Sequence, residues 1–510
     1  MKNIFLAMMV LFFVPIAAQE TYENTKLIDN DLNGTARYVG MGGAMEALGA
    51  DISTISSNPA GIGLFRKSTF SGSFGLVTQQ DAKEFASANK TNMSFDQAGF
   101  VYSLRNGRSS FLNFAFNYHK SRNFDQILSA SSSLSGASQN KLTYQKFRNK
   151  VFTSKDDPTY SQVDHLYMNN LLYNAGDSTY YNYPAESYMF NRSTTGYIGE
   201  YDFNVSGNIN DRVYLGLTMG IHDVHYKHYS EYSENFASNA DGIAGLTLID
   251  NRKITGTGVD LKFGAIFRPI EDSPFRIGLS VATPTWYDLT TSNTTSLTDG
   301  KTSANIGESY DFKVYTPWKF GVSLGHTVGD YLALGASYEY ADYGSMDTRI
   351  NDGDGYYDDW YGEYYESSSS DDAMNDNTKK VLKGVSTLKL GLEYKPMPEF
   401  AIRLGYNYVS PMFDKEGYKD GTISSAGSYY ASQTDYTNWK ATNRLTCGFG
   451  YAIGQLNLDI AYQYSSTNGD FHPFMNYYES NTASAEDNEA SAVKVSNKRH
   501  QLLFTVGYRF

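Results

Sequence analysis

The chain has 510 residues, 43 of them tyrosine and one of them cysteine, Cys447, and its formal net charge is −13 at pH 7. The negative charge argues against a nucleic-acid partner, because phosphate binding calls for clustered Lys and Arg, and a single cysteine excludes internal disulfides. Beyond residue 19, no run approaches the roughly 20 apolar residues that a membrane-spanning helix needs. If the chain crosses a membrane, it must do so with β-strands. Its abundant tyrosine is typical of residues that lie at membrane–water interfaces.

Residues 1–18 predict a cleaved secretory signal peptide. Lys2 supplies a basic start, residues 4–16 form an apolar stretch, and Ala17 and Ala18 provide small residues at the cleavage site. No cysteine follows the apolar stretch, which argues against a lipid-anchored protein. The mature chain is therefore expected to leave the cytoplasm.

Residues 19–67 precede the first predicted strand and are expected to form a partly helical hatch. Ala, Met, Leu and Ile recur there at near-helical spacing, which predicts one or two short helices interrupted by glycine. A turn is expected at Asn58 and Pro59, because the residue before a proline disfavours helix. A small apolar segment ahead of a barrel with polar inner positions is expected to plug its lumen. The residues assigned to hatch gating are Gly40, Gly42, Gly43, Asn58, Pro59, Ala60 and Gly61.

Residues 68–510 alternate between apolar and polar side chains with the period of a strand. In 112–118, for example, Leu112, Phe114, Phe116 and Tyr118 alternate with smaller or polar residues. The pattern predicts about fourteen strands, with an error of about two. They are expected near 68–78, 94–104, 110–120, 195–208, 211–226, 252–268, 274–283, 310–328, 330–343, 381–395, 399–409, 442–453, 455–465 and 499–510.

Short and long connections alternate between these strands. The long, polar ones are expected to be extracellular loops at 121–193, 227–251, 284–309, 344–380, 410–441 and 466–498, and 124–137 is expected to be helical. An even strand count with every second link short favours a closed transmembrane antiparallel β-barrel, since an open edge in lipid would leave backbone groups unpaired. A soluble β-sandwich or fibre is the alternative, because its strands also alternate.

His222, His225 and His228 are spaced by three residues, which would suit haem or metal capture at the cell surface. In a strand, however, His225 points away from the other two, so the spacing favours structural or solvated histidines.

Asp352, Asp354 and Asp358 resemble part of a calcium loop, in which carboxylates two residues apart surround the ion. Ile350 stands where the first ligand should be, and further acidic residues follow. A solvated acidic loop is therefore favoured over a metal site.

Five charged residues are expected to face the lumen: Asp260, Lys262, Lys389, Glu393 and Arg403. They could steer a carboxylate-bearing ligand, but mixed charges inside a barrel more often pair with one another and hold a plug. No Ser-His-Asp arrangement is specified by spacing, so we do not expect an enzyme.

The chain resembles the FadL family of outer-membrane transporters for long-chain fatty acids and other hydrophobic compounds. The resemblance rests on 58–61 (Asn-Pro-Ala-Gly) after the glycine-rich 36–44, on 114–118, on 316–321 and on 403–406. It implies that a ligand leaves sideways through a gap near the third strand, gated by the hatch. It places the hatch turn at Asn58, Pro59 and Ala60 and the lateral-exit strand at Phe114, Phe116, Asn117 and Tyr118, and it transfers no ligand-contact residue.

The favoured function is passive uptake of a fatty-acid-like or aromatic ligand through a monomeric barrel, without a cofactor, in the lipid of a Gram-negative outer membrane. The alternative is a surface receptor that binds haem (hemin) or a host macromolecule through its tyrosine-rich loops. The loop residues that would serve it are Tyr356, Tyr357, Trp360, Tyr364, Tyr365, Tyr429 and Tyr430. An outer-membrane enzyme is a third option, distinguished by a reagent-sensitive nucleophile.

Overall fold

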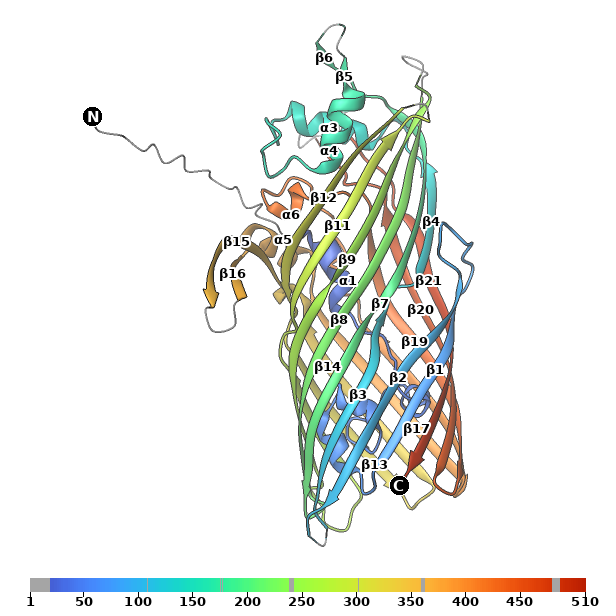
Figure 1. Cartoon of the computed structure of the whole chain (residues 1–510). Coiled ribbons are helices and arrows are strands. Elements are labelled where there is room, and N and C mark those ends of the chain that lie inside the picture. Colours follow the sequence, from blue (N-terminus) through green and yellow to red (C-terminus); the bar gives the residue numbers. More distant parts are fainter. Residues whose placement is uncertain are drawn as a thin grey trace, which may run out of the picture.

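The computed structural model describes residues 19–107, 109–174, 176, 178–237, 243–300, 302–358, 363–478 and 487–510. They form a closed antiparallel barrel of 14 strands, which confirms the predicted fold class (Figure 1). The predicted signal peptide, residues 1–18, lies outside the described residues. Among the described residues, no helix is long and apolar enough to cross a bilayer.

The wall is built from hairpins in chain order, and some of its strands are broken into two labelled segments. The last strand pairs with the first from Thr69↔Arg509 to Gln79↔Arg499, and this pairing closes the barrel. The wall strands are β1 (Thr69–Gln79), β2 (Thr91–Arg105), β3 (Phe111–Asn123) with β4 (Gln126–Ser133), β7 (Ala185–Ile209), β8 (Val213–Phe236), β9 (Gly245–Phe267), β10 (Arg276–Ala282) with β11 (Trp286–Thr298), β12 (Ser303–Tyr315) with β13 (Lys319–Val328), β14 (Leu332–Asp342), β17 (Gly384–Met397), β18 (Phe400–Val409), β19 (Tyr436–Ile453), β20 (Leu456–His472) and β21 (Val493–Arg509).

The side chains alternate across the wall as the sequence predicts. On β3, Leu112 and Phe114 are exposed on the outer surface, whereas Asn113 and Asn117 are fully buried toward the lumen. Large exposed apolar residues occur in the same way on the other wall strands, for example Phe320 and Leu445. A continuous surface of this kind is stable only against hydrocarbon, as in a membrane-spanning barrel.

The wall has unequal height. Strands β7, β8, β9, β11 and β12 continue far beyond the upper ends of β1 and β2 in the view of Figure 1. The segments 227–251 and 284–309, expected to be loops, are therefore mostly strand. The prediction of a helix over 124–137 is wrong, because this segment forms β4 and pairs with β7 from Gln126↔Thr194 to Ser133↔Ser187. The backbone hydrogen bonds available along β7 stabilise a strand here despite the helical spacing of the side chains.

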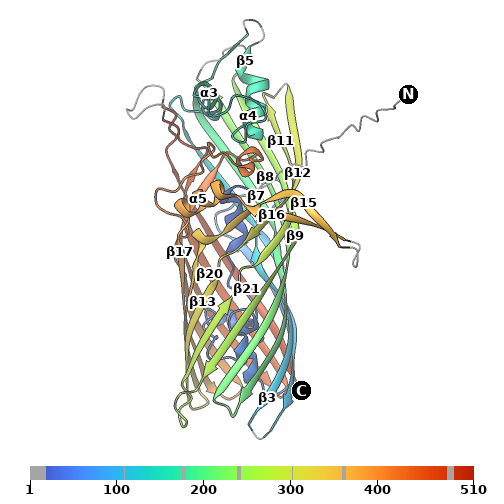
Figure 2. The same ribbon diagram turned by 90° about the vertical axis from the view of Figure 1, so that its left-hand side faces the viewer.

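A cap of short elements covers the upper mouth (Figure 2). It consists of α3 (Gln139–Arg148), α4 (Gln162–Tyr167), the π-helical η3 (Met168–Leu172), β5 (Tyr173–Asn174), β6 (Thr179–Tyr180), η5 (Tyr343–Ser345), α5 (Asp372–Val381) and α6 (Ala426–Tyr429). The hairpin of β15 (Asp347–Asp358) and β16 (Glu363–Ser370) projects sideways from the wall instead (Figure 1). Buried apolar residues such as Leu142, Phe152 and Leu172 pack there against Phe190 and Phe471 of the extended wall. The cap is therefore a packed layer with its own core.

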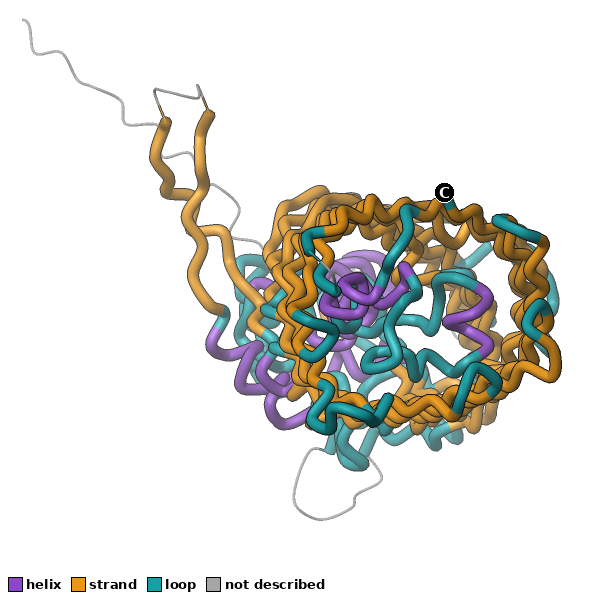
Figure 3. The backbone as a smooth tube through the Cα atoms, turned by 90° about the horizontal axis from the view of Figure 1, so that it is seen from below, coloured by secondary structure: helices purple, strands orange, loops and turns teal. Residues whose placement is uncertain are grey.

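The hatch lies inside the ring of strands, as the view from below shows (Figure 3). It comprises α1 (Thr21–Ile28), α2 (Ala36–Gly40) and two 3₁₀ turns, η1 (Ile52–Ile55) and η2 (Pro59–Leu64). The stretch 47–55 is helical only in η1, because Gly49 and Ala50 both take positive φ values, 62° and 53°. A left-handed pair cannot continue a helix.

Candidate functional site

The hatch sits against glycines of the inner wall, which we call the glycine belt. A Cβ added at any of them would come closer than 3.0 Å to a backbone atom of the hatch, at Pro59, Ala60, Ala44, Met41 or Gly42. The belt consists of Gly216 on β8, Gly264 on β9, Gly335 on β14, Gly391 on β17 and Gly405 on β18. The absence of side chains lets hatch backbone touch wall backbone on two sides of the barrel.

The predicted hatch glycines meet this wall directly. Gly42 has φ +63°, and a Cβ there would lie 2.8 Å from the Tyr406 nitrogen, so both its conformation and its position require glycine. Gly43 follows with φ +81°. The Gly40 carbonyl accepts a hydrogen bond from Thr446 Oγ1 at 3.2 Å.

The Asn58–Gly61 segment is buried against β7, β8 and β9. The Asn58 side chain accepts from the Ala60 nitrogen at 3.2 Å and caps η2, in which Pro59 is the first residue. The Pro59 carbonyl accepts from Ser206 Oγ at 2.8 Å, and the Gly61 carbonyl accepts from the Ala50 nitrogen. This turn is part of the contact between hatch and wall.

Two of the five predicted lumen charges, Glu393 and Lys389, are ion-paired to the hatch, and a third, Arg403, is paired with Glu393. Glu393 lies 3.0 Å from Arg37 of α2 and 2.6 Å from Arg403, which in turn lies 2.6 Å from Asp459. On the neighbouring wall, Lys389 Nζ lies 2.8 Å from Glu46 of the hatch. All five side chains are buried, among them Asp260 and Lys262, which pair with each other at 2.8 Å.

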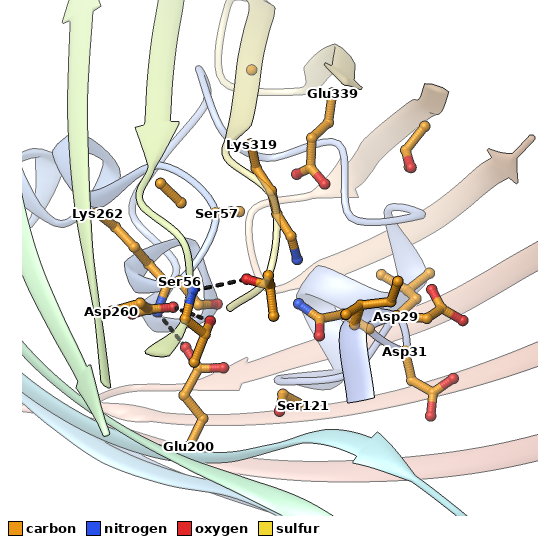
Figure 4. Close-up of a pocket in the computed structure, with 18 of the residues that line it drawn as sticks. Asp29, Asp31, Ser56, Ser57, Ser121, Glu200, Asp260, Lys262, Lys319 and Glu339 are labelled. Atoms are coloured by element: carbon orange, nitrogen blue, oxygen red, sulfur yellow. Dashed lines mark hydrogen bonds and ion pairs between the residues drawn. The ribbon is translucent and has the colours of Figure 1, made fainter. Parts of the chain in front are cut away.

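A polar chamber of about 140 Å³ lies between hatch residues 27–33 and 56–57 and the inner wall. Figure 4 shows Glu200, Asp260 and Lys262 on one side of it and Asp29 and Asp31 on the other. The lining also includes two histidines, His119 and His222, and two serines of the hatch.

A second cavity, the outer pocket, has a volume of about 180 Å³ and lies beside α1. Its aromatic lining is packed, because the Tyr22 ring lies 5.1 Å from the rings of both Phe413 and Tyr436. Lys26 also lines it, donates to Gln433 at 3.4 Å and lies over the ring of Tyr226, but it is ion-paired with no described carboxylate. The pocket thus combines apolar rings with charged side chains of both signs, among which Lys26 supplies an ammonium group.

The wall is interrupted between β2 and β3. Their ladder ends at Gln97↔His119, although β2 begins at Thr91 and β3 continues to Asn123. Here β3 still pairs with β7, but its edge toward β2 is bonded to the hatch instead. The Asp31 nitrogen donates to the Ser121 carbonyl at 2.8 Å, and Asn33 Nδ2 donates to the Lys120 carbonyl at 3.0 Å. Hatch residues thus close a break in the wall.

A small cavity of about 40 Å³, the wall pocket, lies at this break. Asp31 and Arg444 line the wall pocket, the outer pocket and the chamber alike. Their side chains lie 3.9 Å apart, and Arg122 lies 3.5 Å from Asp31 on the β3 side. The three cavities therefore meet at one charged group on the hatch.

A further cavity of about 340 Å³ lies at the lower end, between the hatch and the wall around Glu393, Lys395 and Arg509. It shares no lining residue with the chamber, the outer pocket or the wall pocket. The hatch separates the two sets.

The predicted lateral-exit residues lie just below the break. Phe114, Phe116 and Tyr118 are on the outer face, where Tyr118 stacks on Phe95 at 5.7 Å, and Asn117 points inward and accepts from Gln97 at 2.8 Å. All four are in the paired part of β3. The residues of β3 that lie beyond the β2 ladder and pair only with β7, Lys120 to Asn123, were missed by sequence reasoning.

The three spaced histidines do not converge. His222 and His228 are buried inside, whereas His225 is partly exposed and lies 2.9 Å from Asp223. The Nε2 atom of His228 is hydrogen-bonded to Ser230 Oγ at 3.0 Å. Instead, His222 lies beside Glu200 and Asp260, and His119 of β3 approaches the same Glu200.

The calcium candidates Asp352, Asp354 and Asp358 have their backbone in strand β15, not in the compact loop that such a site requires. Their side chains, like those of Tyr356, Tyr357, Tyr364 and Tyr365, are outside what the structure describes, as is Trp360. Tyr430 is buried and stacks on Tyr310 at 4.4 Å, so it belongs to a core.

No protein-family model and no curated protein matches the chain. Solved structures do. The toluene transporter TodX of Pseudomonas putida matches with a TM-score of 0.52 and 12% identity, over 94% of this chain and 99% of that one. A FadL homologue of Pseudomonas aeruginosa matches with a TM-score of 0.52 and 13% identity, over 95% and 100%.

The chain has the fold of the FadL family. The match extends over the FadL-like barrel and its hatch together, since nearly the whole of both chains is covered. At this identity, the likeness concerns the fold, and the chemistry must be argued from the residues of this chain.

The glycine belt and the latch at Asp31 and Asn33 were not found from sequence. A signal for the belt exists, namely an inward-facing glycine at a similar height in several strands. No signal marks the latch, because Ser121 and Asp31 are ninety residues apart and meet only when the barrel closes.

Proposed function

We propose that the protein is an outer-membrane channel through which hydrophobic small molecules enter the cell by diffusion. The observation that carries this proposal is the connection of the three upper cavities at Asp31 and Arg444, next to a break in the wall, with no shared residue to the lower cavity. The path then runs from the upper, extracellular mouth to the break between β2 and β3. The ligand leaves into the membrane and does not pass the hatch.

The lining of the outer pocket supports a ligand with an apolar body and an anionic group. Burying a hydrocarbon chain against Tyr22, Phe413 and Tyr436 contributes about 0.8 kcal/mol per CH₂ group. Lys26 offers an ammonium group free to pair with a carboxylate. The toluene transporter with the same fold supports a hydrophobic body.

The gate in this proposal is the hatch segment 29–33. It holds the break closed through Asp31 and Asn33, and Asn33 Nδ2 also donates to Asp96 of β2 at 2.9 Å. These few hydrogen bonds can exchange with the ligand or with water at a net cost of about 1 kcal/mol each. The ion pairs of Arg122 with Asp29 and Asp31 are partly exposed to the cavities, so they too can exchange with water. Lifting the whole hatch from the glycine belt would break far more contacts.

Cross-linking tests this gate. In a Cys447→Ser background, Asn33→Cys with Asp96→Cys joins the latch to the wall, and Glu46→Cys with Ser337→Cys joins the hatch to the wall away from the break. A short thiol cross-linker on the first pair is expected to abolish uptake of radiolabelled oleate and of toluene, reversibly on reduction. The second pair is expected to leave uptake unchanged.

Two results would contradict the proposal. Unchanged uptake with the first pair cross-linked would rule out the lateral path. Loss of uptake with both pairs would mean that the whole hatch must move, as the resemblance to the family first implied for Asn58 and Pro59.

A further inference from the structure

The wall has a second interruption, which we call the second gap. Below it, the β13–β14 ladder ends at Lys319↔Ala341. Above it, the β12–β15 ladder begins at Tyr315↔Asp347. Between these ladders, the described stretches 316–318 and 342–346 lie on opposite edges, and no backbone hydrogen bond joins them. The wall strands β3, β7, β8, β9, β10–β11 and β12–β13 separate this gap from the break between β2 and β3, so it faces another side of the barrel.

Two prolines lie where the strands beside the gap are broken. Pro284 connects β10 to β11, and Pro317 connects β12 to β13. Proline has no backbone N–H and cannot donate to a ladder. The nitrogen of Thr316 donates to the Thr285 carbonyl at 3.1 Å, which is on the side away from the gap. Because Pro317 offers no donor, the gap leaves fewer polar backbone groups unsatisfied than it would with another residue.

The second gap lies at the outer interface of the membrane. Strand β13 extends for 10 residues from the gap to the lower turn, and a tilted strand needs about 9–11 residues to cross the hydrocarbon layer. Trp286, Trp318 and Tyr340 lie around the gap in the register of the wall, and all three are exposed. Trp and Tyr gather at membrane–water interfaces. A molecule in the outer leaflet therefore meets the gap at the level of its head group.

The polar chamber lies directly behind the gap. Thr316 and Lys319 line it from one edge, and Tyr343 lines it from the other. The Tyr343 side chain reaches across to the hatch, where its hydroxyl donates to the Ile28 carbonyl at 3.4 Å. A hydrogen bond of this length is weak and exchanges readily with water.

Lys319 places an ammonium group in the chamber beside the gap, and Figure 4 shows its side chain pointing inward. Its Nζ lies 3.2 Å from the side-chain amide of Asn30, and it is ion-paired with no described carboxylate. The other cations of the lining are already ion-paired, Lys262 with Asp260, Lys389 with Glu46 and Arg444 with Asp31. The chamber thus offers one ammonium group to an anion that enters through the gap.

We infer that the second gap is a membrane-side binding site for a single-chain amphiphile with an anionic head group, namely a long-chain carboxylate. The carboxylate enters the chamber and pairs with Lys319, while the tail stays in the outer leaflet beside Trp318 and Phe320, which are exposed there. The charged hydrogen bond favours the head group inside, and the tail loses no contact with hydrocarbon. A chamber of about 140 Å³ admits a compact carboxylate with water but not a sugar-bearing head group.

This site would let the protein take its ligand from the membrane as well as from the medium. The inference deepens the proposed function by adding a second binding site, and it does not depend on the path between β2 and β3. Binding to the purified barrel therefore tests it separately from uptake.

The test is fluorescence quenching of Trp318 in the full-length barrel, held in lipid nanodiscs. Trp286→Phe, Trp360→Phe and Trp439→Phe leave Trp318 as the only indole. The probe is stearate brominated in the middle of its chain, at a pH at which the acid is ionised, and its methyl ester reports simple partition into the lipid. We expect quenching by the acid to saturate and quenching by the ester to rise without saturation.

Three variants in this background identify the contact. Lys319→Gln is expected to weaken binding of the acid at least about tenfold, whereas Lys319→Arg keeps the charge and should retain binding. Lys379→Gln is the matched control, because Lys379 is exposed and already pairs with Asp376. Heat-modifiable migration on a gel verifies that each variant is folded.

Two results would overturn the inference: equal, unsaturable quenching by the acid and the ester, or saturable binding to folded Lys319→Gln with unchanged affinity. Saturable binding that Lys26→Gln leaves unchanged would support a site distinct from the outer pocket. The same signal in the barrel with the Asn33–Asp96 pair cross-linked would support the inference whatever becomes of the proposed path at β2 and β3.

Discussion

The lower and upper halves of the barrel are packed on different principles. Below, hatch backbone touches wall backbone at the glycine belt, and Arg37 and Glu46 of the hatch are ion-paired to Glu393 and Lys389. Above, three cavities meet at Asp31, and a few hydrogen bonds together with partly exposed ion pairs from Arg122 to Asp29 and Asp31 close the wall. Close packing resists displacement, whereas isolated polar contacts exchange readily with solvent or ligand. The lower half therefore closes the lumen, and the upper half contains the cavities through which the ligand is proposed to move.

The largest effect is expected from the lower half, at Glu393. Glu393→Leu leaves Arg37 of the hatch without its ion-pair partner and leaves the buried Arg403 paired with Asp459 alone. Removing one partner of a buried ion pair costs about 3–5 kcal/mol. We expect a loss of stability of this size in urea unfolding of the barrel. Asp376→Ala, which breaks the exposed pair with Lys379, is the control and should change stability by less than about 0.5 kcal/mol.

A pH-dependent effect of about 3 kcal/mol is expected in the cap. Glu234 lies at the upper end of β8, where the outward side chains are no longer apolar, and it accepts from the Gln139 nitrogen of α3 at 2.6 Å. Burial raises the pKa of its carboxyl from 4.5 to about 7. The folded cap therefore favours the protonated form, so its stability is full below about 4.5 and falls as pH rises toward about 7.

Hydrogen exchange of α3 measures this dependence. Protection of α3 is expected to decrease between these pH values in the wild type and to stay constant in Glu234→Gln. A wild type with constant protection would mean that Glu234 does not hold the cap.

The glycine belt is expected to give an effect of about 1–3 kcal/mol, the usual cost of overpacking. Gly335→Ala places a Cβ against the Ala44 carbonyl of the hatch, whereas Gly72→Ala on β1 meets nothing within 4 Å. The first variant should loosen the hatch and raise ion conductance in planar bilayers, and the second should not. Equal conductance of the two variants would remove the distinction between the halves.

The smallest effect is expected at Lys26 in the outer pocket. Lys26→Gln should weaken binding of laurate about tenfold, or about 1.4 kcal/mol, and leave toluene binding unchanged. Lys440→Gln is the control, because Lys440 lines the same pocket but already pairs with Asp470 at 3.0 Å. Equal losses for laurate and toluene would show that Lys26 acts through packing and not through charge.

The wall was largely predictable, and the candidate site was not. Alternation in 112–118 placed Phe114 outside and Asn117 inside, since a strand has a period of two whatever lies beside it. The helix expected at 124–137 failed because β7 extends far enough to pair with it. Asp260 and Lys262 were expected in the lumen, but their neighbours His119 and Glu200 come from other hairpins.

By itself, the sequence determined the strand count, the two faces of each strand and the hatch with its turn at Asn58, because these follow from local periodicity and backbone chemistry. Only the tertiary structure decided which glycines touch the hatch, where the β2–β3 ladder ends and which charges meet at Asp31. Those features depend on the register and closure of fourteen strands, which bring together side chains that no spacing along the chain relates.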